Sequence, residues 1–182
     1  MSPIRRTGAV SRQIVSRTIY VAARTHTTVK GEVVEGYVLR DAPGWTWKAN
    51  GRDNEGRFDF LVIEHLAYRA GPPLHFHTTF EDSFFVLDGL LTVQLGDDVV
   101  ELGPGDFATA PPGVPHSLTN AHADQSACRA VNLLTPGVGF DRYISQIDKL
   151  AAKGDHEGME RLNAEYDVTI VGPSVADRLG LS

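Results

Sequence analysis

Three histidines in this sequence have the spacing that a metal centre needs. His75 and His77 stand two residues apart, between a Gly-Pro-Pro turn and an apolar run, and His116 follows a later Pro-Pro-Gly turn. Residues i and i+2 of a β-strand project from the same face, so the first two imidazoles point the same way. If His116 lies on a neighbouring antiparallel strand, the three rings can converge on one divalent ion.

An acidic residue beside these histidines would complete the set of ligands. Glu81 and Asp82 both follow His77 closely, but neighbouring strand residues face opposite ways, so only one of them can point inward without a bulge. The apolar pattern that follows does not decide between them, because Phe84/Val86 and Phe85/Leu87 would both make acceptable inner faces. Aspartate is also shorter than glutamate by one C–C bond, about 1.5 Å, which limits its reach.

Short strands separated by Gly and Pro turns must position these residues. Such a pattern is typical of an all-β sandwich or small barrel. The turn at Gly96-Asp97-Asp98 indicates a hairpin. The expected strands are Thr18–Ala22, Val33–Leu39, Phe58–Arg69, Phe84–Leu87, Leu90–Leu95, Val99–Leu102, Phe107–Ala110, His116–Thr119 and Cys128–Leu134.

The hydrophobic period changes after Pro136-Gly137. From residue 138 onward, apolar residues recur at helical spacing and predict a helix that packs on the outside of the barrel. A second helix is expected at about Glu157–Tyr166, and a third after Ser174, which can serve as its N-cap.

The two His-containing stretches resemble the signature motifs of the cupin family. The second motif is matched in full by Gly105, Pro111, Gly113, His116 and Asn120. The first motif is matched by His75, His77 and Gly89, with two departures: Gly71 lies closer to His75 than usual, and the acid, usually Glu, is either Asp82 or Glu81, of which Glu81 breaks the usual spacing. Asp82 keeps the usual six residues before Gly89, and this spacing favours it over Glu81. The resemblance covers roughly residues 58–135.

The resemblance implies an all-β cupin fold, a double-stranded β-helix or jelly-roll barrel with a short C-terminal helical extension. On this interpretation residues 1–30 form an N-terminal arm and first strand, 31–137 the cupin β-barrel and 138–182 the helical extension. His75, His77, Asp82 and His116 would bind a divalent transition metal, for which Fe, Ni, Mn, Zn and Cu are equally suited. Related cupins commonly pair, so we expect a homodimer.

Small single-domain cupins with this ligand set are similar to quercetin-type dioxygenases. That similarity implies an oxidoreductase acting with O2 on a small hydroxy-ketone or otherwise enolisable substrate, with Asp82 (or Glu81) doubling as general base. Two other functions remain open: a non-oxidative isomerase, cyclase or decarboxylase that uses the same metal as a Lewis acid, and a binding module without catalysis. A metal-free pocket in which the histidines bind a ligand or act as acid–base groups is the plainer alternative.

Composition excludes several classes of partner. The net charge of −6 argues against nucleic acid or an anionic membrane surface, since both select basic proteins. The single cysteine, Cys128, cannot form an internal disulfide, and we expect it to be a small buried strand residue. With no long apolar run, the chain is expected to be cytoplasmic. The other histidines (His26, His65, His122, His156) lack metal-ligand spacing and are expected to be ordinary polar positions, and Asn120 is expected to stabilise a turn.

Overall fold

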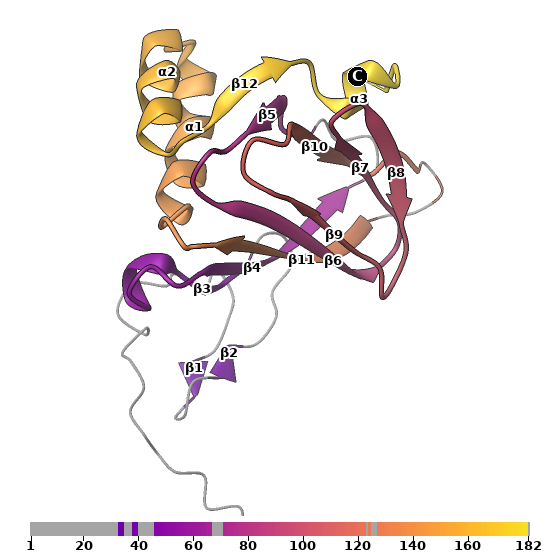
Figure 1. The fold of residues 1–182 in the computed structure, drawn as a ribbon, viewed down its shortest axis with the longest axis horizontal. Coiled ribbons are helices and arrows are strands. Elements are labelled where there is room, and N and C mark those ends of the chain that lie inside the picture. The colour runs from indigo at the N-terminus through magenta and orange to yellow at the C-terminus, as the bar shows by residue number, and fades with distance from the viewer. Residues whose placement is uncertain are drawn as a thin grey trace, which may run out of the picture.

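The computed structural model of the chain describes residues 33–34, 38–39, 46–66, 71–122, 124 and 127–181. The expected N-terminal arm, strand Thr18–Ala22 and His26 lie outside these residues. Within them, the main body consists of two antiparallel sheets, a pair of helices and a short third helix (Figure 1).

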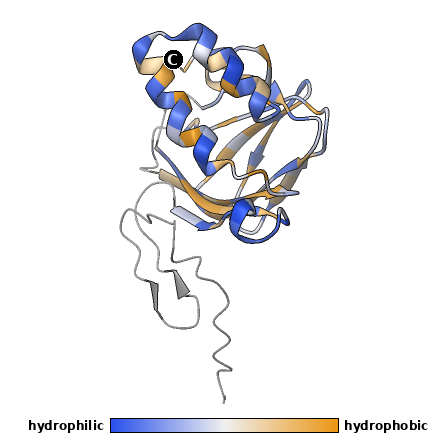
Figure 2. Cartoon of the chain, turned by 90° about the vertical axis from the view of Figure 1, so that its left-hand side faces the viewer, coloured by the Kyte–Doolittle hydropathy of each residue, from blue (hydrophilic) through white to orange (hydrophobic). Residues whose placement is uncertain are grey.

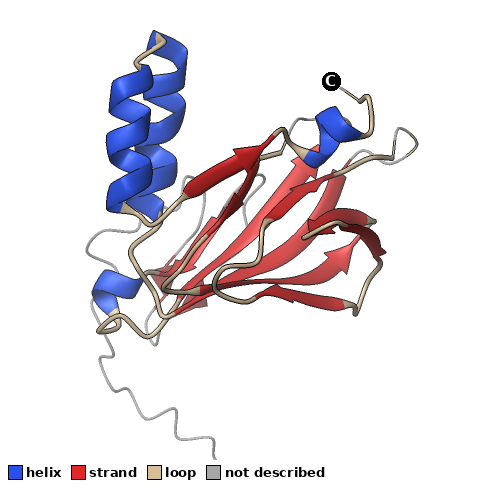
Figure 3. Cartoon of the chain, turned by 45° about the horizontal axis from the view of Figure 1, so that its top comes forward, coloured by secondary structure: helices blue, strands red, loops and turns tan. Residues whose placement is uncertain are grey.

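Two five-stranded sheets enclose the core between them (Figure 3). The first sheet has the strand order β3-β4-β11-β6-β9 and the second has the order β12-β5-β10-β7-β8, with every pairing antiparallel. This arrangement confirms the expected jelly-roll barrel. The strands of the first sheet are β3 Thr46–Ala49, β4 Asp59–Leu66, β6 Glu81–Asp88, β9 Phe107–Ala110 and β11 Ala127–Thr135. Those of the second are β5 Leu74–Phe76, β7 Leu91–Leu95, β8 Asp98–Leu102, β10 His116–Thr119 and β12 Thr169–Gly172.

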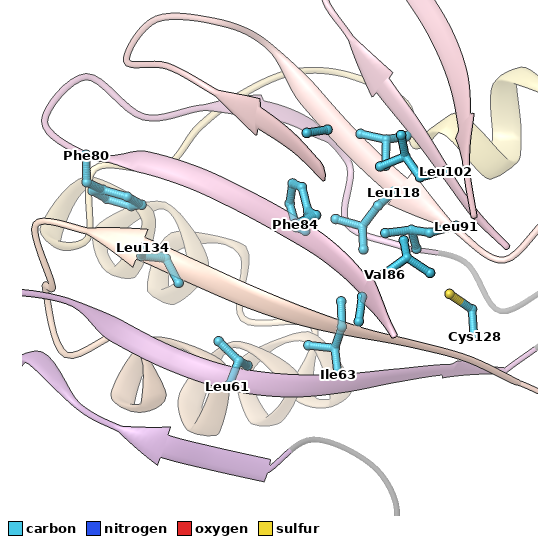
Figure 4. Close-up of a cluster of buried hydrophobic side chains, with 13 residues drawn as sticks. Leu61, Ile63, Phe80, Phe84, Val86, Leu91, Leu102, Leu118, Cys128 and Leu134 are labelled. Carbon is cyan, nitrogen blue, oxygen red and sulfur yellow. The ribbon is translucent and has the colours of Figure 1, made fainter. Parts of the chain in front are cut away.

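Alternating strand residues fill the space between the sheets. Along β11 buried and half-buried positions alternate, so that Cys128, Ala130 and Leu134 point into the core. Figure 4 shows Cys128 and Leu134 among apolar side chains that come from both sheets. Burial, together with the nearby Asp88 carboxylate, raises the pKa of Cys128 to about 11, so the thiol stays protonated at neutral pH and is a poor nucleophile.

Most of the expected strands are found, with shifts at their ends. The hairpin of β7 and β8 turns at Gly96, whose φ of 59° suits glycine. The long candidate Phe58–Arg69 is observed as β4, Asp59–Leu66, and its residues 67–69 lie outside the described part of the chain. The expected single strand Val33–Leu39 is instead two short strands, β1 Val33–Val34 and β2 Val38–Leu39, which pair antiparallel with each other. Gly36 interrupts this β-branched run in the sequence, and glycine weakens strand interiors.

All three expected helices are present after the barrel. They are α1 Asp141–Lys153, α2 His156–Glu165 and α3 Val175–Arg178. Hydrophilic and hydrophobic residues alternate along α1 and α2 (Figure 2), and the two helices pack through Tyr143, Leu162 and Tyr166. Ser174 caps α3 as expected, in a reciprocal capping box with Asp177.

No helix in the described part of the chain has the length and apolar character needed to cross a bilayer.

Strand β12 was not among the expected elements. It lies between α2 and α3 and adds an edge strand to the second sheet, where it pairs with β5. Its four residues are mostly exposed, so they show none of the alternation that predicts a half-buried strand. The C-terminal extension therefore supplies part of the barrel as well as helices.

A buried carboxylate attaches the start of α1 to the barrel. Asp59, at the start of β4, is fully buried, and its Oδ1 accepts a hydrogen bond of 2.6 Å from the Gly51 amide. Its Oδ2 accepts from the amides of Val138, Gly139 and Phe140 at 2.8, 2.9 and 3.2 Å. Bonds to an ionised group are stronger than neutral ones. They hold Phe140 beside the residues described next.

Candidate metal centre

Two paired strands of the second sheet carry the three histidines. His75 on β5 lies directly opposite His116 at the start of β10, and cross-strand partners project from the same face. His77 follows β5, two residues beyond His75. The ring centroids are 4.4 Å apart for His75–His116, 4.9 Å for His75–His77 and 5.2 Å for His77–His116. All three side chains are buried.

The acid comes from the opposite sheet. Asp82 on β6 is buried, and its Oδ2 lies 3.3 Å from His116 Nε2. The ligand atoms of Asp82 and the three histidines all lie within 4.8 Å of one another. Glu81 is exposed to solvent, as strand alternation requires when its neighbour points inward. The structure therefore brings Asp82 into the cluster and leaves Glu81 outside it, and the shorter side chain reaches the histidines.

Each imidazole is held by a backbone carbonyl. The Nδ1 atoms of His75, His77 and His116 lie 2.8, 2.8 and 3.0 Å from the carbonyl oxygens of Pro73, Asp167 and Val114, respectively. A carbonyl can only accept a hydrogen bond, so each Nδ1 carries a proton and donates it. Every Nε2 is then the ring atom that faces the other side chains of the cluster. Metal-binding histidines are commonly oriented in this way.

The charges in the cluster are strongly coupled. Burial lowers the pKa of His75 to about 3, helped by the neighbouring His116 and His77 rings, and burial also lowers the pKa of His77. Burial alone would lower the pKa of His116, but the hydrogen bond and charge of Asp82 hold it above its ordinary value. Burial alone would raise the pKa of Asp82, but its bond to His116 and the nearby imidazoles hold it below.

The cluster fits a divalent cation. His77 Nε2 is buried and has no hydrogen-bond partner, which is uncommon for a buried polar atom. In the metal-free protein a proton on His116 Nε2 makes the 3.3 Å contact with Asp82 Oδ2 a charged hydrogen bond. Once His116 is neutral, two acceptors face each other there, and a divalent cation between them would take the place of the proton. A metal ion among the four side chains would satisfy both conditions. The nitrogen and oxygen donors suit several first-row metals equally.

Sequence reasoning missed three residues that support the cluster. Phe80 stacks on the His77 ring with centroids 4.0 Å apart, and Phe140 meets the same ring edge-on at 5.9 Å. The Asn132 amide donates to Asp82 Oδ1 and, at 3.2 Å, to the Ser83 carbonyl. Asn132 could have been found, since it is a polar residue at an inward position between the apolar Ala130 and Leu134.

The loop of the second motif packs on the first. The Gly113 amide donates a 2.6 Å hydrogen bond to the His77 carbonyl, and the φ of 85° at Gly113 favours glycine. Asn120 is buried after β10; its side chain donates to the His65 carbonyl and accepts from the His122 amide, both at 3.1 Å. Asn120 thus stabilises a turn, as expected.

The remaining described histidines lie outside the cluster. His65 is buried on β4 of the first sheet, and His156 is exposed at the start of α2. His122 contacts the Glu101 carboxylate on the surface. None of them belongs to a group of metal-ligand type among the described residues.

Comparison with known proteins gives one family. A family model described as a cupin domain matches residues 62–132. The chain is 32% identical over 102 residues to quercetin 2,3-dioxygenase of Bacillus subtilis, a match that covers 51% of this chain and 29% of that protein. The chain therefore spans less than a third of the length of this relative.

Solved structures with low sequence identity are similar to parts of the chain. KdgF from Halomonas sp. has a TM-score of 0.46 and 18% identity, over 60% of this chain and 87% of that one. A conserved protein with a double-stranded beta-helix domain from Klebsiella pneumoniae has a TM-score of 0.42 and 21% identity, over 57% and 86% of the two chains.

The matched segment is the part of the chain that carries the cluster. It runs from within β4 to within β11 and includes His75, His77, Asp82 and His116. The two sheets built around it have the strand order and antiparallel pairing of a jelly-roll barrel. Residues 62–132 therefore carry a cupin domain.

Proposed function

We propose that this protein is a metal-dependent oxidoreductase, a quercetinase-like dioxygenase that acts on a small hydroxy-ketone or another enolisable substrate. The observation that carries the proposal is the convergence of His75, His77, Asp82 and His116, with each imidazole fixed so that Nε2 faces the others. The similarity to the Bacillus quercetin 2,3-dioxygenase over 102 residues supports it.

The four side chains would hold the metal through the Nε2 atoms of the three histidines and through Oδ2 of Asp82. Three neutral imidazoles and one carboxylate leave a net charge of about +1 around a divalent ion, which favours an anionic substrate as a fifth ligand. When bound, such an ion supplies Lewis acidity that lowers the pKa of a hydroxyl group beside it. The metal remains a divalent transition ion of unassigned identity.

Asp82 is the proposed general base. Its carboxylate is buried and ionised, because the bond to His116 and the surrounding imidazoles hold its pKa below the ordinary value. Asn132 donates to Oδ1 and so leaves Oδ2 directed toward the histidines. A substrate hydroxyl within hydrogen-bond reach of Oδ2 would transfer its proton there. Phe80 and Phe140, which pack against His77, would exclude water from that side.

The proposed reaction needs no reductant other than the substrate. A dioxygenase cleaves a C–C bond of the substrate and adds both oxygen atoms of O2 to the products, so the substrate supplies all the electrons. O2 uptake should then equal substrate loss. This stoichiometry separates the oxidative reaction from isomerisation, cyclisation or decarboxylation at the same site, which consume no O2.

The test is O2 uptake by protein reconstituted separately with Fe(II), Mn(II), Co(II), Ni(II), Cu(II) and Zn(II), with flavonols and β-diketones as substrates. We expect matched loss of O2 and substrate with at least one metal. Asp82→Asn should abolish turnover, and Glu81→Gln, which changes the adjacent exposed acid, should retain it. No turnover with any metal would overturn the proposal. Substrate loss without O2 uptake would assign a non-oxidative reaction, and unchanged retention of the compound would assign a binding role.

We also propose that the protein acts in the cytoplasm as a homodimer. The free, buried thiol of Cys128 supports a reducing compartment. Pairing of two copies is supported by three large apolar side chains exposed on the outer face of the first sheet: Phe85, Leu87 and Phe107 are 40, 41 and 60% exposed. Light scattering of the purified protein tests the dimer, and a monomeric mass at micromolar concentration would contradict it.

A further inference from the structure

One of the three histidines takes its orienting carbonyl from a distant part of the chain. His75 and His116 each bond to a carbonyl two residues earlier, at Pro73 and Val114. His77 bonds instead to the carbonyl of Asp167, which lies 90 residues away, between α2 and β12. The first two contacts are local to their own strands. The third depends on the C-terminal extension being docked against β5.

Asp167 is held in place by its own side chain. Its Oδ2 accepts hydrogen bonds from the amides of Thr78 and Thr79 and from the Thr79 hydroxyl, each at 2.7 Å. Its Oδ1 accepts from the Thr78 hydroxyl at 2.9 Å. These two threonines follow His77 directly in the sequence. The carboxylate therefore ties the residue that supplies the carbonyl to the residues beside the ring that receives it.

The backbone at Asp167 adopts an uncommon conformation. Its φ is 55°, in the left-handed region that non-glycine residues seldom occupy, although Asp tolerates it better than most. Next to it, β12 pairs with β5, with Thr169 opposite Phe76 and Ile170 opposite His75. On its far side, β12 leads to Pro173, whose carbonyl accepts from the Leu74 amide at 3.2 Å.

We propose that Asp167 is a positioning residue of the metal centre: its carboxylate grips Thr78 and Thr79 so that its carbonyl fixes the tautomer and orientation of His77. The inference rests on the proposed metal centre for its function, but the tautomer of His77 can be measured in the metal-free protein. With Nδ1 protonated by this contact, Nε2 of His77 is the atom left facing His75, His116 and Asp82. Without it, the ring can turn or exchange its proton between the two nitrogens.

Asp167→Gly separates a positioning role from a purely structural one. Glycine accepts a φ of 55° without strain, so the turn can persist while all four hydrogen bonds to the carboxylate are lost. Asp167→Asn keeps a side-chain oxygen and tolerates the same φ, and should restore part of the function. The control is Asp155→Ala, which removes the N-cap of α2, bonded to the Gly158 amide at 2.8 Å, in the same extension but away from His77.

The first measurement is ¹⁵N NMR of the histidine rings in the metal-free protein at neutral pH. The wild type and Asp155→Ala should show His77 with the proton on Nδ1, whereas Asp167→Gly should show a mixture of tautomers. Asp167→Asn should lie between them. A His77 ring with an unchanged tautomer in folded Asp167→Gly would overturn the inference.

The second measurement is metal affinity, by competition of Co(II) or Zn(II) with a chromogenic chelator. Residues that orient a ligand typically change affinity by about 10–100-fold, which is the loss expected for Asp167→Gly, while Asp155→Ala should match the wild type. Equal affinities for Asp167→Gly and the wild type would contradict the proposal. If the wild type itself binds no metal, the proposed centre fails, and the NMR result still decides whether Asp167 positions His77.

A second variant covers the case in which Asp167→Gly does not fold. Thr78→Val with Thr79→Val removes two of the four bonds to the carboxylate, keeps both amides and nearly preserves side-chain volume. We expect a smaller rise in the second tautomer and a smaller loss of affinity than for Asp167→Gly. Wild-type behaviour in both measurements would count against the role of the carboxylate.

Discussion

Strands β6 and β10 each contribute to the candidate metal centre at one end of the barrel interior and to an apolar core at the other. Successive inward residues of β6 are Asp82, Phe84 and Val86, and those of β10 are His116 and Leu118. The apolar end needs only side chains of suitable volume from alternating positions. The metal end also needs the ligand atom of each polar side chain to point toward one shared position.

The four side chains of the metal centre are oriented by groups that lie outside the strands that carry them. Carbonyls from the segments before His75 and His116, the turn at Asp167 and the amide of Asn132 on β11 fix the four side chains. The apolar end makes no such demands. Substitutions in the apolar region should therefore lower the free energy of unfolding. Substitutions in the metal region should instead lower metal affinity.

The largest effect is expected at a ligand itself. His116→Ala removes one of four ligands and the hydrogen bond that keeps Asp82 ionised. We expect metal affinity to fall by more than the roughly 100-fold upper range for residues that only orient ligands. Chelator competition and circular dichroism measure affinity and folding together. Wild-type affinity in the folded variant would remove His116 from the centre.

Truncation in the apolar region should have the opposite outcome. Leu91 is fully buried on β7, and Leu91→Ala should lower the free energy of unfolding by about 2–5 kcal/mol. Metal affinity of the folded fraction should stay unchanged. Leu179→Ala, at a residue 45% exposed, is the matched control and should cost far less in chemical denaturation. A large loss of metal affinity in Leu91→Ala would contradict the proposed independence of the apolar core and the metal centre.

A substitution at Asn132 tests whether the hydrogen bond that orients Asp82 contributes to metal affinity. Asn132→Ala removes the donor to Asp82 Oδ1 while leaving all four ligands in place. We expect a loss of about 10–100-fold in metal affinity, which is about 1.4–2.7 kcal/mol. Asn163→Ala, which removes the acceptor for the Tyr143 hydroxyl in the helix pair, should leave affinity unchanged. Equal behaviour of the two variants would show that Asp82 needs no such support.

The remaining effect is the pH dependence of stability in the metal-free protein, which is spread over several pH units. The pKa of His75 falls from 6.5 to about 3 on folding, so below pH 6.5 the unfolded chain takes up a proton that the folded chain does not. Stability should therefore fall as the pH drops from 6.5 toward 3, by up to about 1.4 kcal/mol per pH unit for this group. His77, whose pKa is also lowered, adds to the slope.

Urea denaturation at a series of pH values measures this slope. His75→Gln should reduce it, while His156→Gln, at an exposed position in α2, should leave it as in the wild type. An unchanged slope in His75→Gln would mean that this buried ring does not resist protonation.

The elements that local patterns describe well were predicted from the sequence. Alternation and Gly/Pro turns located β7 to β11, and Ser174 marked the start of α3. One choice depended on tertiary contacts. Whether Asp82 or Glu81 faces inward is decided by the register of β6 between β11 and β9, since either face of the strand looked apolar enough.

The supporting residues were harder to predict because their partners are far away in the sequence. Asp167 is 90 residues from His77, and Asn132 is 50 residues from Asp82. A turn aspartate between a helix and an exposed four-residue strand carries no local sign of such a contact. Only the pairing of β12 with β5 brings it to the histidines.

Strand β12 also has a genetic consequence. A stop codon after Tyr166 would leave the matched cupin segment and all four clustered side chains in the encoded product. That product would nevertheless lack the carbonyl that holds His77 and the strand that borders His75. Truncated alleles that keep the recognisable motifs should therefore be judged by whether they retain the last sixteen or so residues. Loss of that segment alone would remove the contact that orients the His77 ring.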